Sequence, residues 1–243
     1  EMIERIPDLE ALIVPIGGGG LISGIAVAAQ GLKPELAVFG VESARFPSMK
    51  LALAGQPVEC GTATLADGIA VKQPGRLTRA IVRERVRDIL VVEERTLEQA
   101  VGLLIEIEKT IAEGAGAAAL AALLSHRESF AGQRVGILIS GGNIDPIVIA
   151  RVIERDLART SRLVRLRIVL PDQPSALAAV TRLIADEEAN IVEVWHQRTF
   201  TRLALESAEV DLMLETRGPD HASRVCERLG QNGYSAHMLD TPD

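Results

Sequence analysis

Between residues 11 and 157, short apolar runs that read as strands alternate with longer segments that have the spacing of helices. The strand-like runs are continuously apolar, which is typical of strands buried on both faces of a parallel sheet. They are ALIVPI (11–16), LAVFGVE (36–42), DILVVE (88–93) and VGILIS (135–140). This order of strands and helices predicts an α/β fold, with a mostly parallel sheet flanked by helices.

The segments between these runs have the composition and periodicity of helices. One helix is expected directly after the first run, and a longer one from Leu97 to about Ser125. Gly114 and Gly116 fall within the longer segment, where a glycine costs about 1 kcal/mol relative to alanine. We therefore expect the long helix to break or bend at these two glycines.

The hydrophobic pattern changes after Arg162. The run LVRLRIVLP (163–171) alternates apolar and charged residues with a period of two, as a strand with one buried face does. Helical and alternating segments then follow in the order βαββαβ, which predicts a ferredoxin-like sheet with two helices on one face. We expect a first domain over residues 1–157, a linker over 158–162 and a second domain over 163–243.

The composition argues against several kinds of partner. The 243 residues carry a formal net charge of −7, so neither nucleic acid nor an anionic membrane surface is an expected partner. The longest mostly apolar stretch, AGAAALAALL, is about half of what a bilayer crossing needs. Cys60, Cys226 and four scattered histidines show no metal-ligand spacing, so no metal site is expected. We expect a cytoplasmic protein.

Four consecutive glycines, Gly17 to Gly20, lie between the first strand-like run and the helix expected after it. A turn at this place leaves backbone N–H groups free at a helix N-terminus, where anions and especially phosphates bind. The spacing matches neither the dinucleotide motif G-x-G-x-x-G nor the P-loop. The run therefore predicts a phosphate site without a nucleotide fingerprint, with a tight structural turn as the alternative.

A second run of small residues, Ser140 to Asn143, follows the last strand-like run of the first domain. Ligands of open α/β sheets bind at the carboxyl ends of the strands, so both loops are expected to contribute to one site. The two loops belong to five motifs in the order VPIGGGGLISG, GVES, LADGIAV, AEGAGA and ISGGN. Through these motifs, residues 1–157 resemble the carboxyl half of the threonine/serine dehydratases. Those are pyridoxal 5'-phosphate (PLP) enzymes of fold type II, the tryptophan-synthase-β fold group.

The resemblance implies roles for particular residues. Ser140 matches the residue whose hydroxyl meets the pyridine nitrogen of PLP, where a neutral partner favours elimination of a β-hydroxyl over transamination. Glu113 matches an acidic residue bordering the cofactor, with a helix-interior carboxylate that faces solvent as the alternative. Glu42 matches a position that helps bind a divalent cation in some relatives, but Ser48 replaces their further carboxylate, so no metal is expected. The residues that match the phosphate-binding loop are Gly17, Gly18, Gly19, Gly20 and Leu21.

The implied activity is the conversion of L-threonine to 2-oxobutanoate and ammonia, with L-serine giving pyruvate as a second reaction. It requires a Schiff-base lysine, which in the family precedes the glycine loop in a Ser-x-Lys context. All four lysines of this sequence follow the loop and lack that context: Lys33, Lys50, Lys72 and Lys109. We therefore expect a truncated chain that has no catalytic lysine and is inactive alone. The alternatives are a non-catalytic, amino-acid-binding or regulatory short form and a serine racemase-like enzyme.

Residues 162–243, through DQPSAL and NIVEVWHQR, are similar to an ACT regulatory domain. The resemblance implies that an amino-acid effector such as isoleucine or valine binds at Asp172 and Pro174, with Asn190 on the facing strand. The alternative for Asp172 and Pro174 is an ordinary helix cap. Ser175 replaces a glycine of the usual motif, and its side chain would narrow the pocket. Pairing of such domains also implies a homo-oligomer.

Overall fold

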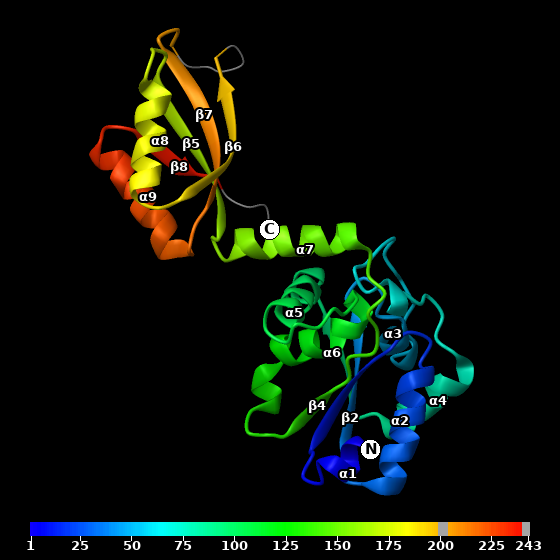
Figure 1. Cartoon of the computed structure of the whole chain (residues 1–243). Coiled ribbons are helices and arrows are strands. Elements are labelled where there is room, and N and C mark those ends of the chain that lie inside the picture. The colour runs from blue at the N-terminus through cyan, green and yellow to red at the C-terminus, as the bar shows by residue number, and fades with distance from the viewer. Residues whose placement is uncertain (199–203, 240–243) are drawn as a thin grey trace. The chain divides into compact units, whose positions relative to one another are not determined.

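The computed structural model describes residues 1–198 and 204–239. The chain forms two compact units, unit 1 (Glu1–Val152) and unit 2 (Ile153–Asp243), shown in Figure 1. The division falls within helix α7 (Pro146–Arg159), upstream of the linker predicted at 158–162. Within the described ranges, no helix combines the length and the apolar character that a membrane crossing requires.

Unit 1 contains a four-stranded parallel sheet, which confirms the predicted α/β fold. The strands lie in the order β3-β2-β1-β4, so β1 pairs with β2 on one side and with β4 on the other. β4 is shorter than its apolar run, because strand pairing ends at Ile137. The strands are β1 (Ala11–Pro15), β2 (Ala37–Ser43), β3 (Asp88–Val92) and β4 (Val135–Ile137).

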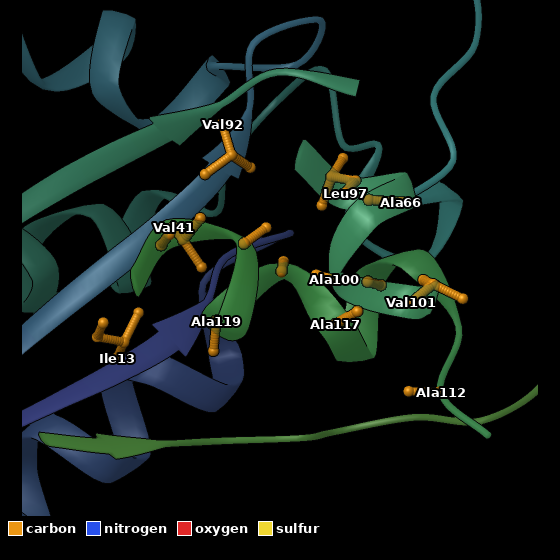
Figure 2. Packing of buried hydrophobic residues seen from close by; sticks show 14 of the residues in the cluster. Ile13, Val41, Ala66, Val92, Leu97, Ala100, Val101, Ala112, Ala117 and Ala119 are labelled. Atoms are coloured by element: carbon orange, nitrogen blue, oxygen red, sulfur yellow. The ribbon is translucent and has the colours of Figure 1, made fainter. Parts of the chain in front are cut away.

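Helices cover both faces of this sheet. Alternate residues of β1 face opposite ways: Ile13 packs into the cluster formed with α5 and α6, whereas Val14 packs into the cluster formed with α2 and α4. Figure 2 shows Ala119 of α6 beside Ile13 of β1 and Val41 of β2. The helical segments are α1 (Met2–Arg5), α2 (Gly20–Leu32), α3 (Ser48–Leu53), η1 (Asp67–Ile69), α4 (Arg76–Arg85), α5 (Glu94–Glu106), α6 (Gly114–Ser125) and η2 (Arg127–Phe130).

The long helix predicted over 97–125 is two helices, and the predicted position of the break was wrong. α5 ends at Glu106, and Gly114 and Gly116 lie in the first turn of α6. These glycines permit close packing there. A Cβ on Gly114 would lie 2.3 Å from the carbonyl oxygen of Leu65, and one on Gly116 would lie 2.3 Å from that of Gly141. The start of α6 therefore packs directly against two loops.

Unit 2 has the predicted order βαββαβ. Its four strands form an antiparallel sheet in the order β6-β7-β5-β8. Leu166 and Ile168 of β5 are buried together with Val180 of α8 and Val225 of α9, and Figure 1 shows both helices on one face of the sheet. The elements are β5 (Leu163–Pro171), α8 (Ala176–Asp186), β6 (Asn190–Gln197), β7 (Ser207–Glu215), α9 (Pro219–Gln231) and β8 (Ser235–Met238).

Candidate functional site at the carboxyl edge of the parallel sheet

The order of strands in unit 1 reverses at β1. The chain runs from β1 outward to β2 and β3, then returns to place β4 on the opposite side of β1. Such a reversal leaves a crevice outside the carboxyl ends of the two strands, which is the usual ligand site of open α/β sheets. The glycine loop leaves β1 here and the Ser140 loop leaves β4. The N–H of Leu138 donates to Ile13 O over 3.2 Å, so the two strands are still joined where these loops begin.

The glycine loop offers a row of free hydrogen-bond donors. The backbone N–H groups of residues 17–21 have no acceptor in the part of the chain that the structure describes. Gly19 is the N-cap of α2 and has a φ of 90°, which a residue with a side chain rarely adopts. The space beside Gly18 and Gly20 is open on the side where a Cβ would lie. Free amides at the start of a long helix are suited to an anion such as a phosphate.

Glu113 lies at the same edge of the sheet, beside the loop that follows β4. It is the N-cap of α6, and its backbone N–H donates to Gly141 O over 3.1 Å. A Cβ on Gly141 would approach Glu113 Oε1 to 2.2 Å, and one on Gly68 would approach it to 3.3 Å. Gly68 in turn packs against Gly17, because a Cβ on Gly17 would lie 3.5 Å from Gly68 O. The Glu113 side chain is thus half-buried beside Gly68 and Gly141. Glu113 is the N-cap of α6 and not a helix-interior residue, and its place beside a cofactor stays a prediction.

Ser140 precedes Gly141 directly and is exposed at the same edge. Its hydroxyl has no hydrogen-bond partner among residues 1–198 and 204–239, so it is free to meet a ligand. The site therefore combines open main-chain donors, a free hydroxyl and a half-buried carboxylate. A phosphorylated, heteroaromatic cofactor such as PLP fits this set: the loop at residues 17–21 would hold its phosphate and Ser140 would meet its ring nitrogen.

Glu42 is the penultimate residue of β2, at the same carboxyl edge of the sheet, and its carboxylate binds main-chain groups. Its carboxylate accepts the N–H of Met49 over 2.8 Å and the N–H of Lys50 over 3.0 Å, at the start of α3. The residue is only 1% exposed, and this burial raises its pKa to about 7 against the lowering effect of those hydrogen bonds. Within the described residues, no three His, Cys, Asp or Glu side chains are grouped as metal ligands would be.

Three of the four lysines are held by main-chain carbonyl groups. Lys33 Nζ donates to Pro7 O, Lys50 Nζ to Ile89 O and Lys109 Nζ to Glu106 O. Ile89 lies at the amino end of β3, the edge of the sheet opposite the glycine loop. These contacts give the lysines structural roles on the surface of unit 1.

The residues predicted to bind an effector in unit 2 are only partly brought together. Asp172 and Pro174 line a hollow of about 520 Å³ between the turn after β5, α8 and the end of β6. Arg198 Nε donates to both carboxylate oxygens of Asp172, at 2.8 and 3.0 Å. Asn190 is at the opposite end of β6, roughly 25 Å away along the strand, where it donates to Glu215 over 3.0 Å. Within one chain, Asn190 and Asp172 therefore do not form one site.

Reasoning from the sequence did not identify several residues at these sites. Thr78 and Gly75 contact the glycine loop from a distance of about sixty positions along the chain, and Arg198 contacts Asp172 across the sheet. Their sequence neighbourhoods carry no motif that links them to these partners. The contacts are made by packing of separate elements, which local periodicity does not report.

Comparisons with known proteins found a matching family and several relatives. The family model for "Pyridoxal-phosphate dependent enzyme" matches residues 1–141. The L-threonine ammonia-lyase of Thermotoga maritima is 39% identical over 242 residues, and the match covers 98% of this chain and 60% of that protein. The L-threonine ammonia-lyase of Geobacter sulfurreducens is 42% identical over 241 residues, with the same shares covered.

A solved structure, the threonine deaminase of T.th., superimposes with a TM-score of 0.55 at 39% identity, over 59% of this chain and 53% of that one. The chain thus spans about three fifths of the length of the curated relatives it matches. The family match includes the glycine loop, Glu113 and the loop up to Gly141. On these grounds the chain belongs to the family of pyridoxal-phosphate-dependent enzymes.

Proposed function

We propose that this chain supplies the cofactor-phosphate site of a PLP-dependent L-threonine ammonia-lyase that also accepts L-serine. The observation that carries the proposal is the row of free amides at residues 17–21, which faces the same sheet edge as Ser140 and Glu113. The homology to L-threonine ammonia-lyases over almost the whole chain supports the reaction class. When bound, PLP supplies an electron sink for reactions at the α-carbon of an amino acid.

Each residue then has a distinct task. The amides of residues 17–21 bind the phosphate and fix the position of the cofactor. The Ser140 hydroxyl hydrogen-bonds the ring nitrogen without adding a negative charge, which favours loss of a β-hydroxyl group over transamination. The Glu113 carboxylate borders the site. None of the four lysines stands in a Ser-x-Lys context, so we expect the chain to bind PLP but not to turn over threonine by itself.

The proposal is tested by joining this chain to the part of the Thermotoga maritima relative that lies outside the match, which is about two fifths of that protein. The chimera, with PLP and L-threonine, should release 2-oxobutanoate and ammonia, whereas the chain alone should release neither. A folded chimera that binds PLP but forms no 2-oxobutanoate would contradict the lyase activity. Formation of D-serine from L-serine would instead favour a racemase-like enzyme.

We also infer that unit 2 is an ACT-like module that binds an amino-acid effector and pairs with a second copy. The βαββαβ order and the hollow beside Asp172 support this inference. An effector's amino group would have to displace Arg198 from Asp172. Calorimetry with isoleucine, valine, serine and threonine should give heat with at least one of them, and Asp172→Asn should abolish it. No heat with any of the four would contradict effector binding.

A further inference from the structure

Thr78, in the first turn of α4, hydrogen-bonds the glycine loop on the side of the loop that faces α4. Thr78 Oγ1 donates to Gly18 O over 2.7 Å and also lies 3.0 Å from Gly75 O. The N–H of Gly75 reaches the same Gly18 oxygen at 3.3 Å. The carbonyl group of Gly18 is therefore directed at the start of α4 by two donors.

The direction of this carbonyl decides the direction of the next amide. In a planar trans peptide the C=O of one residue and the N–H of the following residue point in opposite directions. No described peptide bond of the chain is cis. Because Gly18 O points toward α4, the N–H of Gly19 points to the face of the loop away from α4, where it has no acceptor in the described residues.

Packing prevents the loop from turning away from this arrangement. A Cβ on Gly19 would lie 2.7 Å from Met49 Cε and 2.9 Å from the Cβ of Thr78, so the loop is pressed against both side chains. Thr78 is itself connected to the helix that follows the loop, since the buried Ser23 of α2 donates from Oγ to Thr78 O at 3.4 Å. The start of α2, the start of α4 and the loop thus support one another.

We propose that Thr78 is a positioning residue for the phosphate loop. Its hydroxyl fixes the Gly18 carbonyl and so keeps the N–H of Gly19 available to a bound phosphate group that Thr78 does not touch. This role deepens the proposed function and rests on it for the identity of the ligand. The orientation of the loop, however, is a property of the cofactor-free chain and can be measured without any ligand.

The test compares Thr78→Val, which removes the hydroxyl but retains the shape, with Thr78→Ser, which retains the hydroxyl. Thr160→Val is the matched control, because Thr160 Oγ1 donates to a main-chain oxygen, Asp156 O, at 2.8 Å outside the site. Binding of PLP and of inorganic phosphate is measured by titration. Amide hydrogen exchange is measured without ligand at Gly75 and Ser23, whose N–H groups donate to carbonyl groups of the glycine loop. We expect Thr78→Val to weaken PLP binding about tenfold, the usual effect of one lost hydrogen bond, and to speed exchange at these two amides.

Thr78→Ser and Thr160→Val should stay within about twofold of the wild type in both measurements. Equal PLP binding and equal exchange in all four proteins would overturn the role of Thr78. If the wild type binds neither PLP nor phosphate, the proposed function fails, and the exchange rates alone still decide whether Thr78 orients the loop. Should Thr78→Val not fold, Thr78→Ala compared with Thr78→Ser gives the same contrast.

Discussion

The two units each bury a carboxylate, but they surround it with different donors. In unit 1, Glu42 accepts hydrogen bonds from the main-chain N–H groups of Met49 and Lys50. In unit 2, Asp211 on β7 is 2% exposed and accepts hydrogen bonds from the guanidinium groups of Arg165 and Arg167. Main-chain dipoles satisfy a carboxylate without adding a full charge, whereas each guanidinium adds one.

The pKa values of the two carboxylates diverge for this reason. Burial raises the pKa of Glu42 to about 7, since two amide dipoles do not offset the cost of removing the charge from water. Hydrogen bonds from Arg167 and Arg165 hold the pKa of Asp211 below its ordinary value of 3.8, even though burial acts the other way. Both side chains are almost unexposed, but Glu42 lies deeper, so burial dominates its pKa, whereas the arginine partners dominate the pKa of Asp211.

The turns that join a strand to a helix show a second contrast. Gly19 before α2 has a φ of 90°, and Ser175 before α8 has a φ of 76°. Both backbones are left-handed, but the site of a Cβ on Gly19 is filled by Met49 and Thr78, whereas Ser175 is exposed. A residue with a side chain can adopt the left-handed conformation at some cost in backbone strain. Where other atoms already fill the Cβ position, as at Gly19, a side chain is excluded.

The largest expected effect is that of Gly19→Ala. The new methyl group meets Met49 and Thr78 in a left-handed conformation, and overpacking together with strain should lower the free energy of unfolding by roughly 2–4 kcal/mol. Gly18→Ala is the matched control, because nothing lies within 4 Å of its Cβ position, and it should cost less than about 1 kcal/mol. Urea unfolding followed by circular dichroism measures both, and equal effects would contradict the packing argument.

An intermediate effect is expected from pH, with opposite signs in the two units. Glu42 has a raised pKa, so its contribution is fully present below its unfolded value near 4.5 and is lost as the pH rises through about 7. Unit 1 should lose about 2 kcal/mol between pH 5 and pH 8, and Glu42→Gln should flatten this slope. Asp211 has a lowered pKa, so its contribution to unit 2 is constant over that range and is lost only as the pH falls below about 4.

The chain permits the two units to be followed separately. Its single Trp, Trp195, and its single Tyr, Tyr234, both lie in unit 2, so fluorescence reports on unit 2 while circular dichroism reports on both units. The wild type and Glu42→Gln are compared at pH 5 and pH 8 by both methods. If all the unfolding curves shift by the same amount, Glu42 is not the cause of the pH dependence of unit 1.

The smallest effect is expected for Ser175→Gly. Glycine adopts the φ of 76° without steric cost, so the substitution should stabilise unit 2 by about 0.5–1 kcal/mol. Trp195 fluorescence during urea unfolding measures the change, with Ser207→Gly as a control on a strand, where glycine should destabilise. A loss of stability in Ser175→Gly would show that the serine side chain makes a compensating interaction.

Much of the fold could be predicted from the sequence because it depends on local patterns. Continuous apolar runs identified the parallel strands of unit 1, and the change to a period of two at Leu163 identified the antiparallel sheet of unit 2. The glycine run at 17–20 and the Ser140 loop were also evident, because turns after strands require small residues. The break between α5 and α6 was misplaced, since Gly114 and Gly116 serve packing against Leu65 and Gly141 and do not end a helix.

Hydrophobic periodicity and turn chemistry in the sequence thus determined the strands of both sheets, several of the helices and the loop that is rich in free amides. Only the tertiary structure decided that β4 pairs with β1, which places the two loops at one edge, and that Glu113 lies between Gly68 and Gly141. It also decided that Thr78 reaches Gly18 across 60 positions of the chain. Local preferences act over a few residues, whereas these contacts exist because burying both faces of the sheet brings distant segments together.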